Sequence, residues 1–405
     1  MEKRPVIAIV GGGAAGCFAA ANLKRMLPKA KVILFESGKR PLVKVGMTGG
    51  GRCNLTNTFE SVNSLERVYP RGVSVMKRAL KIFSAEDTAD WFRKEGVTLK
   101  VEGEGRVFPC SDDANEIVST LLSSLQKVGV DVITEKRLSF ISEGFHLSFV
   151  DGSSFDADCV LIATGGGASE FLKPLGIEIV PPVPSLFSFR IEDSSLKALS
   201  GNSVSHVSLR LGKFSSEGPL LITDWGLSGP AVLKLSSYAA RFLYEHSYHG
   251  DLSINWLGGV NERETRDTIQ SLAYSNSKKM GSTVSPEGIP SRVWSLLLSR
   301  AGLREDQRWA EIGSKSINRL VETLINDRYH ISGKNRFKQE FVTAGGVSVS
   351  EINISTMESR KHQGLFFAGE VLDIDAVTGG FNLQAAWSTG FTAARSIASK
   401  FADFD

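Results

Sequence analysis

Two patterns of hydrophobic positions alternate through the first 36 residues of the chain. Residues 6–10 and 32–35 are short, wholly apolar runs, which is typical of strands buried on both faces of a parallel sheet. Between them, residues 17–27 form an Ala-rich segment that stops before Pro28 and is predicted to be a helix. A glycine-rich turn, residues 11–16, joins the first strand to this helix. The pattern therefore predicts a strand–turn–helix–strand unit.

This unit carries the complete G-x-G-x-x-G fingerprint, followed by an acidic residue after the second strand. Gly11 permits the tight turn, Gly13 lets the backbone approach a pyrophosphate, and Gly16 lets the helix pack closely on the strand. The free N–H groups of the helix N-terminus attract the anion. Glu36 can accept hydrogen bonds from a ribose hydroxyl. We expect a dinucleotide site here; the alternative is a glycine turn that binds nothing.

Later segments predict that the chain leaves the first domain, forms an insertion and then returns to complete that domain. Period-two alternation around the turn Asp151-Gly152 predicts a β-hairpin, which precedes a buried strand at 159–163. A hairpin placed before a strand that ends in Ala-Thr-Gly is typical of domains that bind FAD rather than NAD. The other expected elements are helices at 78–96, 116–128 (capped by Asp112-Asp113) and 385–400, strands at 130–134 and 365–368, a boundary at 181–184, a β-rich region at 186–256, a helical region at 261–326, a return toward the sheet at 337–342 and a glycine loop at 343–347.

Composition narrows the class of protein. A chain of 405 residues with 42% hydrophobic and 22% charged residues is expected to form two or three globular domains. No apolar run approaches the roughly 20 residues that a membrane span needs. The four cysteines are far apart, which argues against a disulfide framework or a zinc site and for a reducing, cytoplasmic compartment. The net charge of +3 permits an RNA partner without demanding one. We expect no membrane, DNA or metal partner, and the pattern does not define an oligomeric state.

Five motifs occur in a defined order: G-G-G-A-A-G at 11–16, T-G-G-G-R-C-N-L-T-N at 48–57, G-L-S-G-P at 226–230, T-A-G-G-V at 343–347, and F-A-G-E-V-L-D with T-G-G-F-N-L-Q within 367–384. On the basis of these five motifs, the chain resembles the YhiN/BaiN-like family of bacterial FAD-dependent oxidoreductases. Two small departures are Ala376, where many relatives carry Gly, and Phe381, where Tyr is common.

The resemblance implies an α/β fold: a split Rossmann-like FAD-binding domain of the two-dinucleotide-fold type (1–184 and 343–405), an inserted β-rich domain (185–258 and 328–342) and an inserted helical domain (259–327). It also implies that Glu370 lies near the ribityl phosphate and that the helix opening at Asn382 points its N–H groups at the flavin pyrimidine. The expected FAD-binding residues are Gly11, Gly13, Ala14, Ala15, Gly16, Glu36, Ser37, Lys44, Gly50, Gly51, Arg52, Asn54, Thr56, Val132, Thr164, Gly165, Gly369, Glu370, Gly380, Asn382 and Leu383.

Cys53 is the one candidate for protein-side chemistry. Beside Arg52 in a glycine loop, its thiol is expected either to favour the thiolate or to donate a proton near the flavin, while the alternative is simple packing. Arg52 and Lys44 are expected to stabilise reduced flavin or a substrate phosphate, or to be solvated surface charges. Since only one complete dinucleotide fingerprint is present, NADPH or NADH would dock transiently as reductant.

The resemblance implies more than one substrate. The main hypothesis is NAD(P)H-driven reduction of a C=C bond, such as that of uridine to dihydrouridine in ribosomal RNA. One alternative is a small-molecule substrate, either a steroid-like enone that is reduced or an amino-ketone or amine oxidised by a flavin oxidase. An alternative of another class is a non-catalytic flavin- or RNA-binding protein.

Overall fold

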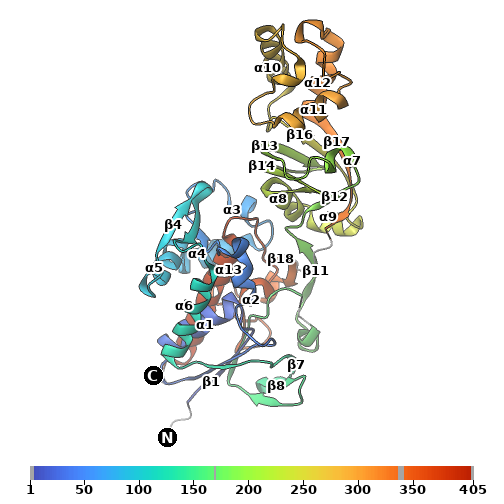
Figure 1. Ribbon diagram of the computed structural model, residues 1–405. Coiled ribbons are helices and arrows are strands. Elements are labelled where there is room, and N and C mark those ends of the chain that lie inside the picture. Colours follow the sequence, from blue (N-terminus) through green and yellow to red (C-terminus); the bar gives the residue numbers. More distant parts are fainter. Residues whose placement is uncertain (1–3, 168–169, 336–341, 403–405) are drawn as a thin grey trace. The chain divides into compact units, whose positions relative to one another are not determined.

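A five-stranded parallel sheet in the order β19-β10-β1-β2-β6 lies at the centre of the first structural unit (Figure 1). The computed structural model describes residues 4–167, 170–335 and 342–402. The chain forms two compact units, Met1–Pro182 with Val342–Asp405, and Val183–Phe341. The strands of the central sheet are β1 (Val6–Val10), β2 (Lys31–Phe35), β6 (Asp131–Ile133), β10 (Cys159–Ile162) and β19 (Leu365–Phe367).

The strand order reverses beside β1. The chain runs from β1 through β2 to β6 on one side, and β10 and β19 occupy the other side, with every pair parallel. In a doubly wound sheet this arrangement opens a crevice at the carboxyl ends of the strands, where ligands bind. The fold therefore places any dinucleotide at the end of β1.

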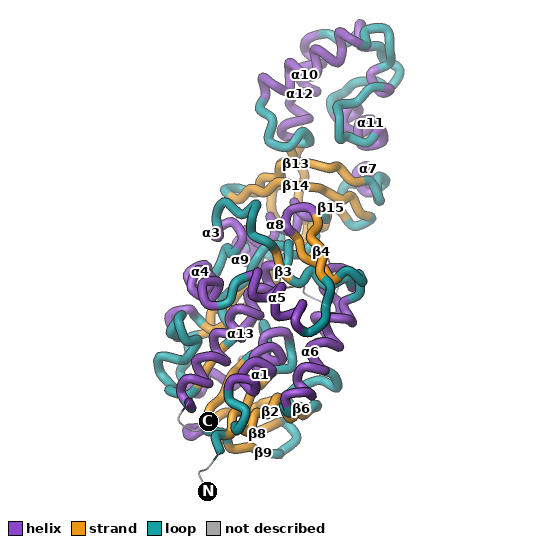
Figure 2. Tube along the Cα trace, turned by 90° about the vertical axis from the view of Figure 1, so that its left-hand side faces the viewer, coloured by secondary structure: helices purple, strands orange, loops and turns teal. Residues whose placement is uncertain are grey.

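Helices α1 (Ala14–Met26), α6 (Ala114–Val128) and α13 (Phe381–Lys400) lie side by side against the sheet (Figure 2). Gly390 lets α13 cross α1 closely, because a Cβ there would lie 2.8 Å from the Ala15 carbonyl oxygen. Phe18 of α1 packs against Trp387 of α13 and against Trp91, and all three side chains are buried. Truncating a buried aromatic residue of this kind costs about 3–5 kcal/mol, so these rings contribute much of the stability of the unit.

The single helix expected at 78–96 is wrong. The structure has two helices, α4 (Val73–Ile82) and α5 (Ala85–Lys94). Ser84 interrupts them because its hydroxyl accepts a hydrogen bond from the N–H of Asp87, whose carboxylate accepts one from the N–H of Ser84. This capping box starts a new helix. The hairpin around Asp151-Gly152 is confirmed by β8 (His146–Phe149) and β9 (Ser154–Asp156), and the cap of α6 by Asp113.

The glycine loop expected at 343–347 is also wrong, since this segment lies in strand β18 (Val342–Val347), which pairs with β11 (Ile179–Ser185). The glycines permit close approach: a Cβ on Gly345 would lie 2.6 Å from the Pro181 carbonyl oxygen. The boundary prolines 181–184 likewise lie within β11. The expected return toward the sheet begins in 337–341, outside the described residues. The smaller elements of the unit are α2 (Val43–Met47), α3 (Leu65–Val68), β3 (Thr56–Asn57), β4 (Leu99–Glu102), β5 (Arg106–Pro109) and β7 (Leu138–Ile141).

A closed barrel forms the centre of the second unit, in the order β12-β15-β14-β13-β16-β17. The expected strands and the expected helical region are both present, but the sequence did not indicate α8 and α9 within the β-rich region. The barrel and its helices share one continuous apolar core. None of the described helices is long and apolar enough to cross a membrane. The elements are β12 (Phe189–Ile191), α7 (Ser194–Lys197), β13 (Ser203–Leu211), β14 (Phe214–Thr223), β15 (Gly226–Ser228), α8 (Pro230–Tyr238), α9 (Ala240–Glu245), β16 (Gly250–Asn255), α10 (Glu262–Ser275), α11 (Ser291–Arg300), α12 (Ser314–Asn326) and β17 (Asp327–Lys334).

Candidate functional site

Two glycines of the turn after β1 pack against backbone atoms, and a third faces open space. A Cβ on Gly11 would lie 2.3 Å from the Ala163 carbonyl oxygen, and one on Gly16 would lie 1.9 Å from the Gly11 carbonyl oxygen. These two positions therefore require glycine for packing. At Gly13, in contrast, a Cβ would meet no protein atom within 4 Å. The space beside Gly13 is where a pyrophosphate fits.

The N-terminus of α1 opens onto this space. Gly13 is its N-cap residue and supplies no side-chain cap, and the first turn contains no acidic residue. The first intrahelical bond runs from the N–H of Cys17 to the Gly13 carbonyl. The N–H groups of Ala14, Ala15 and Gly16 consequently have no partner within the helix and are oriented for an anion.

Glu36 lies at the end of β2 beside the same turn. Its Oε2 accepts a hydrogen bond from the N–H of Gly12 at 2.7 Å. Its Oε1 accepts from the N–H of Gly38 at 2.6 Å and from the Ser37 hydroxyl at 3.1 Å. A carboxylate oxygen can accept two hydrogen bonds, so Oε2 keeps a free acceptor position for a ribose hydroxyl.

A second uncapped helix N-terminus occurs at α13. Its N-cap residue, Gly380, has φ 90° and supplies no side-chain cap, so the N–H groups of Phe381, Asn382 and Leu383 have no partner within the helix. The Asn382 side chain bonds to the Ala376 N–H and carbonyl, both at 2.9 Å, and thereby braces the preceding loop. Asn382 can therefore contribute its backbone N–H, and not its side chain, to a ligand.

The segment 54–57 packs directly on the start of α13. With its amide oxygen turned toward Gly380, Asn54 accepts from the Gly380 N–H at 3.1 Å. Asn57 donates to the Gly379 carbonyl at 3.1 Å, and the Leu55 carbonyl accepts from the Trp387 indole at 3.0 Å. Thr56 bonds to the Gln384 side chain. The structure thus brings the predicted loop and the predicted helix start together.

Several other predicted residues lie at the carboxyl ends of β10 and β19. Lys44 Nζ lies 3.4 Å from Glu370 Oε2, and Glu370 Oε1 accepts from the Thr343 N–H at 2.7 Å. A Cβ on Gly165 would lie 3.6 Å from Glu370 Oε2, and one on Gly369 would lie 2.8 Å from the Ala15 Cβ. Thr164 directly follows β10 in the chain, whereas Val132 lies in β6 and pairs with Leu34 of β2.

Cys53 is fully buried, and its backbone has a left-handed φ of 58°. Burial raises the pKa of the Cys53 thiol to about 12, against a smaller opposing effect of a hydrogen bond with Thr48. This burial argues against the thiolate alternative, because desolvation favours the protonated sulfur. The burial favours packing over proton donation, although donation stays a prediction.

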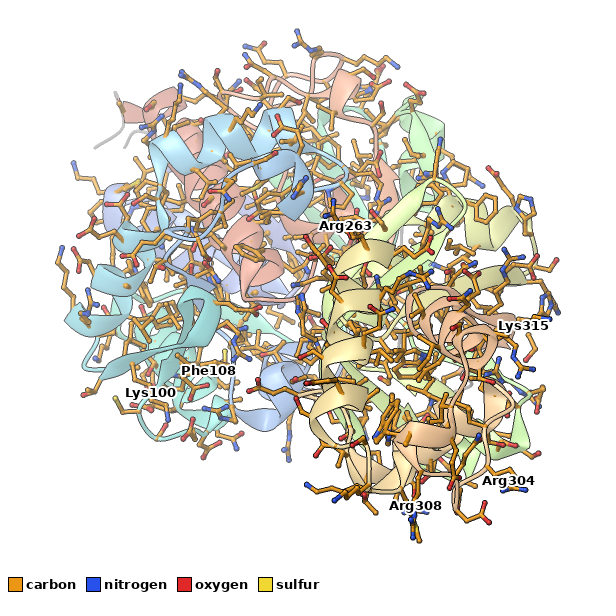
Figure 3. All side chains as sticks on the ribbon, turned by 90° about the horizontal axis from the view of Figure 1, so that it is seen from above. Lys100, Phe108, Arg263, Arg304, Arg308 and Lys315 are labelled. Atoms are coloured by element: carbon orange, nitrogen blue, oxygen red, sulfur yellow. The ribbon has the colours of Figure 1, made fainter. Side chains whose placement is uncertain are left out.

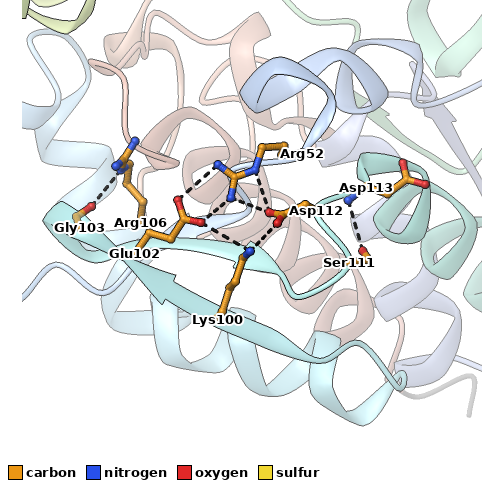
Figure 4. Close-up of polar contacts among 8 residues, drawn as sticks. All are labelled: Arg52, Lys100, Glu102, Gly103, Arg106, Ser111, Asp112 and Asp113. Atoms are coloured by element: carbon orange, nitrogen blue, oxygen red, sulfur yellow. Dashed lines mark hydrogen bonds and ion pairs between the residues drawn. The ribbon is translucent and has the colours of Figure 1, made fainter.

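Arg52 lies in an ion cluster whose other members the sequence pattern does not predict (Figure 4). Its Nε donates to Asp112 Oδ1 at 2.8 Å, and its guanidinium also pairs with Glu102. Lys100 donates to Asp112 Oδ2 at 2.5 Å. The partners stand 50 and 60 residues from Arg52 in the chain, so no local pattern could reveal them. Gly50 and Gly51, beside Arg52, have positive φ and open surroundings.

The two open helix N-termini, the acid at the end of β2 and the space beside Gly13 fit the pyrophosphate, ribose and flavin ends of FAD. Fold and site define an FAD-dependent oxidoreductase built on a Rossmann-type unit. A family model described as "HI0933-like protein Rossmann domain" matches residues 5–396, and the chain belongs to this family. The predicted YhiN/BaiN-like resemblance is thereby confirmed.

Curated relatives align with the chain over nearly its whole length. A ribosomal RNA dihydrouridine synthase of Escherichia coli is 31% identical and covers 98% of each chain. The ribosomal RNA dihydrouridine synthase of Haemophilus influenzae is also 31% identical, over 96% of this chain and 97% of its own. The 3-dehydro-bile acid delta(4,6)-reductase of Clostridium scindens is 29% identical, over 97% and 99%.

Solved structures of flavoenzymes share the fold. A 3-ketosteroid delta1-dehydrogenase from Sterolibacterium denitrificans aligns with a TM-score of 0.52 at 11% identity, covering 97% of this chain and 99% of its own. The FrdA chain of E. coli quinol fumarate reductase aligns with a TM-score of 0.50 at 13% identity, covering 100% and 71%. At such identities these likenesses show the fold alone.

Proposed function

We propose that this enzyme uses NADPH or NADH to reduce the C5=C6 bond of a uridine in ribosomal RNA, giving dihydrouridine. The observation that carries the proposal is the full-length alignment with two proteins named ribosomal RNA dihydrouridine synthase. The balance is one nicotinamide hydride and one proton added across the double bond, which leaves oxidised nicotinamide. Bound FAD would supply the hydride-transfer chemistry that this reaction needs.

The residues of the chain have defined tasks in this reaction. The N–H groups of Ala14 and Ala15 would hold the pyrophosphate of FAD, and Glu36 would hold its ribose. The N–H groups of Asn382 and Leu383 lie at the positive end of the α13 dipole, where they would stabilise negative charge on the pyrimidine end of a bound flavin. The described residues contain a single Rossmann-type sheet, which supports transient docking of the nicotinamide rather than a second dinucleotide site.

Exposed basic side chains of the second unit support RNA as the substrate. The bridge between Met280 and Arg308 brings two loops together. Lys278 and Lys279 in one of them make no ion pair with any described residue, and Tyr274 on the adjoining α10 is 89% exposed. Such cations bind phosphates and an open aromatic ring can stack on a base. Figure 3 labels further exposed cations of this helical region, Arg263, Arg304, Arg308 and Lys315.

A second candidate substrate is a steroid-like enone, which the relationship to the bile acid reductase favours. The chemistry is the same in kind, because a C=C bond conjugated to a carbonyl accepts a hydride at one carbon and a proton at the other. The two candidates differ in the size and charge of the acceptor. An anionic polymer requires cations outside the flavin site, whereas a steroid does not.

Anaerobic mixing of the FAD-loaded protein with NADPH or NADH tests the proposal. We expect rapid bleaching of the flavin band, followed by fast recovery on addition of ribosomal RNA that lacks dihydrouridine. Recovery of the flavin band with an enone but not with RNA would refute RNA as the substrate and favour the steroid-like enone. Absence of bleaching with both nicotinamides would refute the NAD(P)H-driven reaction and favour an oxidase reduced by its own amine or amino-ketone substrate, or a non-catalytic flavoprotein.

A further inference from the structure

The guanidinium of Arg52 is held on several sides by the protein itself (Figure 4). Asp112 and Glu102 accept hydrogen bonds from it, and the centre of the guanidinium lies 4.2 Å from the ring centroid of Phe108. The hydrogen bond with Glu102 and then that with Asp112 raise the pKa of Arg52. The bond with Arg52 lowers the pKa of Glu102, and the bond with Lys100 followed by that with Arg52 lowers the pKa of Asp112. With Lys100 the cluster contains two cations and two anions, so its net charge is zero.

The turn that carries Arg52 has an unfavourable backbone. Gly49, Gly50 and Gly51 have φ of 58°, 69° and 87°, and Cys53 has 58° although it is not glycine. Glycine adopts a left-handed conformation readily, but for Cys53 the same conformation is strained. The backbone bonds that span the turn include one from the Cys53 N–H to the Thr48 carbonyl at 3.0 Å and one from the Arg52 N–H to the Gly49 carbonyl at 3.4 Å. Such a turn needs support from outside to stay in one conformation.

The supports of this turn come from elements distant in sequence. Glu102 ends β4, and Asp112 stands just before α6. On the other side of Arg52, Asn54 contacts Gly380 at the start of α13. The segment after Asn54 is itself bonded into the small sheet β3-β5-β4, since β3 pairs with β5 and the Leu55 N–H donates to the Val107 carbonyl. Arg52 adds a side-chain tether that holds the preceding turn, residues 48–53, to the same sheet.

We propose that Arg52 is a positioning residue: its bonds to Glu102 and Asp112 clamp the turn 48–53 and so keep Asn54 and the open surface of Gly50 and Gly51 in place for the flavin. The positive charge of Arg52 is balanced by the carboxylates of the cluster and does not act on the reduced ring. The inference rests on the assignment of FAD to this unit and is independent of the substrate. It replaces the expectation from the sequence that Arg52 stabilises anionic flavin directly.

Two variants of the full chain separate positioning from charge. Arg52→Met removes the clamp and the charge, whereas the double variant Glu102→Gln with Asp112→Asn removes the clamp and leaves the cation in place. We expect both to weaken FAD binding about tenfold, because the turn must be ordered when FAD binds. We expect both to leave the flavin midpoint potential unchanged. Arg52→Lys, which keeps one ion pair, should restore part of the affinity.

The readouts are the dissociation constant of FAD, from flavin fluorescence, and the midpoint potential of the bound flavin. Arg106→Met is the matched control, because Arg106 lies next to Glu102 on the same hairpin and its Nε donates only to the Gly103 carbonyl among the contacts of Figure 4. A more negative potential in Arg52→Met with a more positive one in the double variant would show that charge acts on the flavin. Unchanged FAD affinity in both variants would refute the clamp. Far-UV circular dichroism of each apoprotein confirms that it is folded.

Discussion

Gly13→Ala is the substitution that most cleanly separates FAD binding from folding. Gly13 has φ −83°, which alanine adopts without strain, and its Cβ would meet no protein atom within 4 Å. The apoprotein should therefore fold as the wild type does. The methyl group would occupy the space in which the pyrophosphate approaches the free N–H groups of α1, so FAD should be excluded.

The magnitudes follow from two opposing effects. Replacing an N-cap glycine by alanine costs about 0.5–1 kcal/mol of helix stability. A ligand at a hundred times its dissociation constant stabilises a protein by about 2.7 kcal/mol. If the affinity falls a hundredfold, the same ligand concentration stabilises by only about 0.4 kcal/mol. The loss of about 2.3 kcal/mol appears only when FAD is present and corresponds to about 5 °C in the melting midpoint of a unit of this size.

The assay is thermal unfolding of the wild type and the variant, each with and without added FAD. Gly313→Ala is the matched control, because Gly313 is also an uncapped N-cap residue, with φ −76° and no atom within 4 Å of an added Cβ, but lies in the second unit. We expect Gly313→Ala to keep the full stabilisation by FAD. Wild-type affinity for FAD in Gly13→Ala would refute the placement of the pyrophosphate beside Gly13.

Three further predictions test the packing, the thiol and the basic surface. Gly16→Val should abolish folding or FAD binding, because a Cβ there would lie 1.9 Å from a backbone oxygen; a stable, FAD-loaded variant would contradict this packing. Cys53→Ala should keep turnover within about tenfold, and a loss of about a hundredfold with normal flavin reduction would instead indicate proton donation. Since the folded-state pKa of Cys53 is raised to about 12, its contribution to stability should be complete below about pH 9 and decline by up to about 1.4 kcal/mol per pH unit above it, a slope that Cys53→Ala should reduce in denaturation curves. The double variant Lys278→Glu with Lys279→Glu should weaken RNA binding and reduce the slope of log affinity against log salt concentration by about two. Lys94→Glu, an exposed control on α5, should change neither quantity.

The parts of the site that the sequence predicts are those encoded by local patterns. Gly11, Gly13, Gly16 and Glu36 lie within one strand–turn–helix–strand unit, whose spacing alone defines their relative positions. The helix expected at 385–400 is present as α13, but it begins four residues earlier, at Phe381, and its opening near Asn382 is implied by the family resemblance rather than by the local pattern. Each of the predictions from local patterns depends only on a stretch of a few tens of consecutive residues.

The parts that the sequence does not predict depend on contacts between distant segments. Arg52 pairs with Glu102 and Asp112, which belong to segments 50 and 60 residues away, so its neighbours in the chain could not reveal these ion pairs. The break at Ser84 depends on a capping box that the apolar periodicity masks. The strand β18 has the sequence pattern of a loop because its glycines, which serve close packing against β11 and its neighbours, also resemble turn residues.

The most direct test of the proposed reaction is a single turnover with the pre-reduced, FAD-loaded enzyme. The enzyme is mixed without oxygen with ribosomal RNA that lacks dihydrouridine, flavin reoxidation is followed optically, and the nucleosides are then counted by mass spectrometry. We expect one dihydrouridine to form for each flavin that is reoxidised. Flavin that stays reduced in the presence of the RNA, or reoxidation without dihydrouridine, would contradict it.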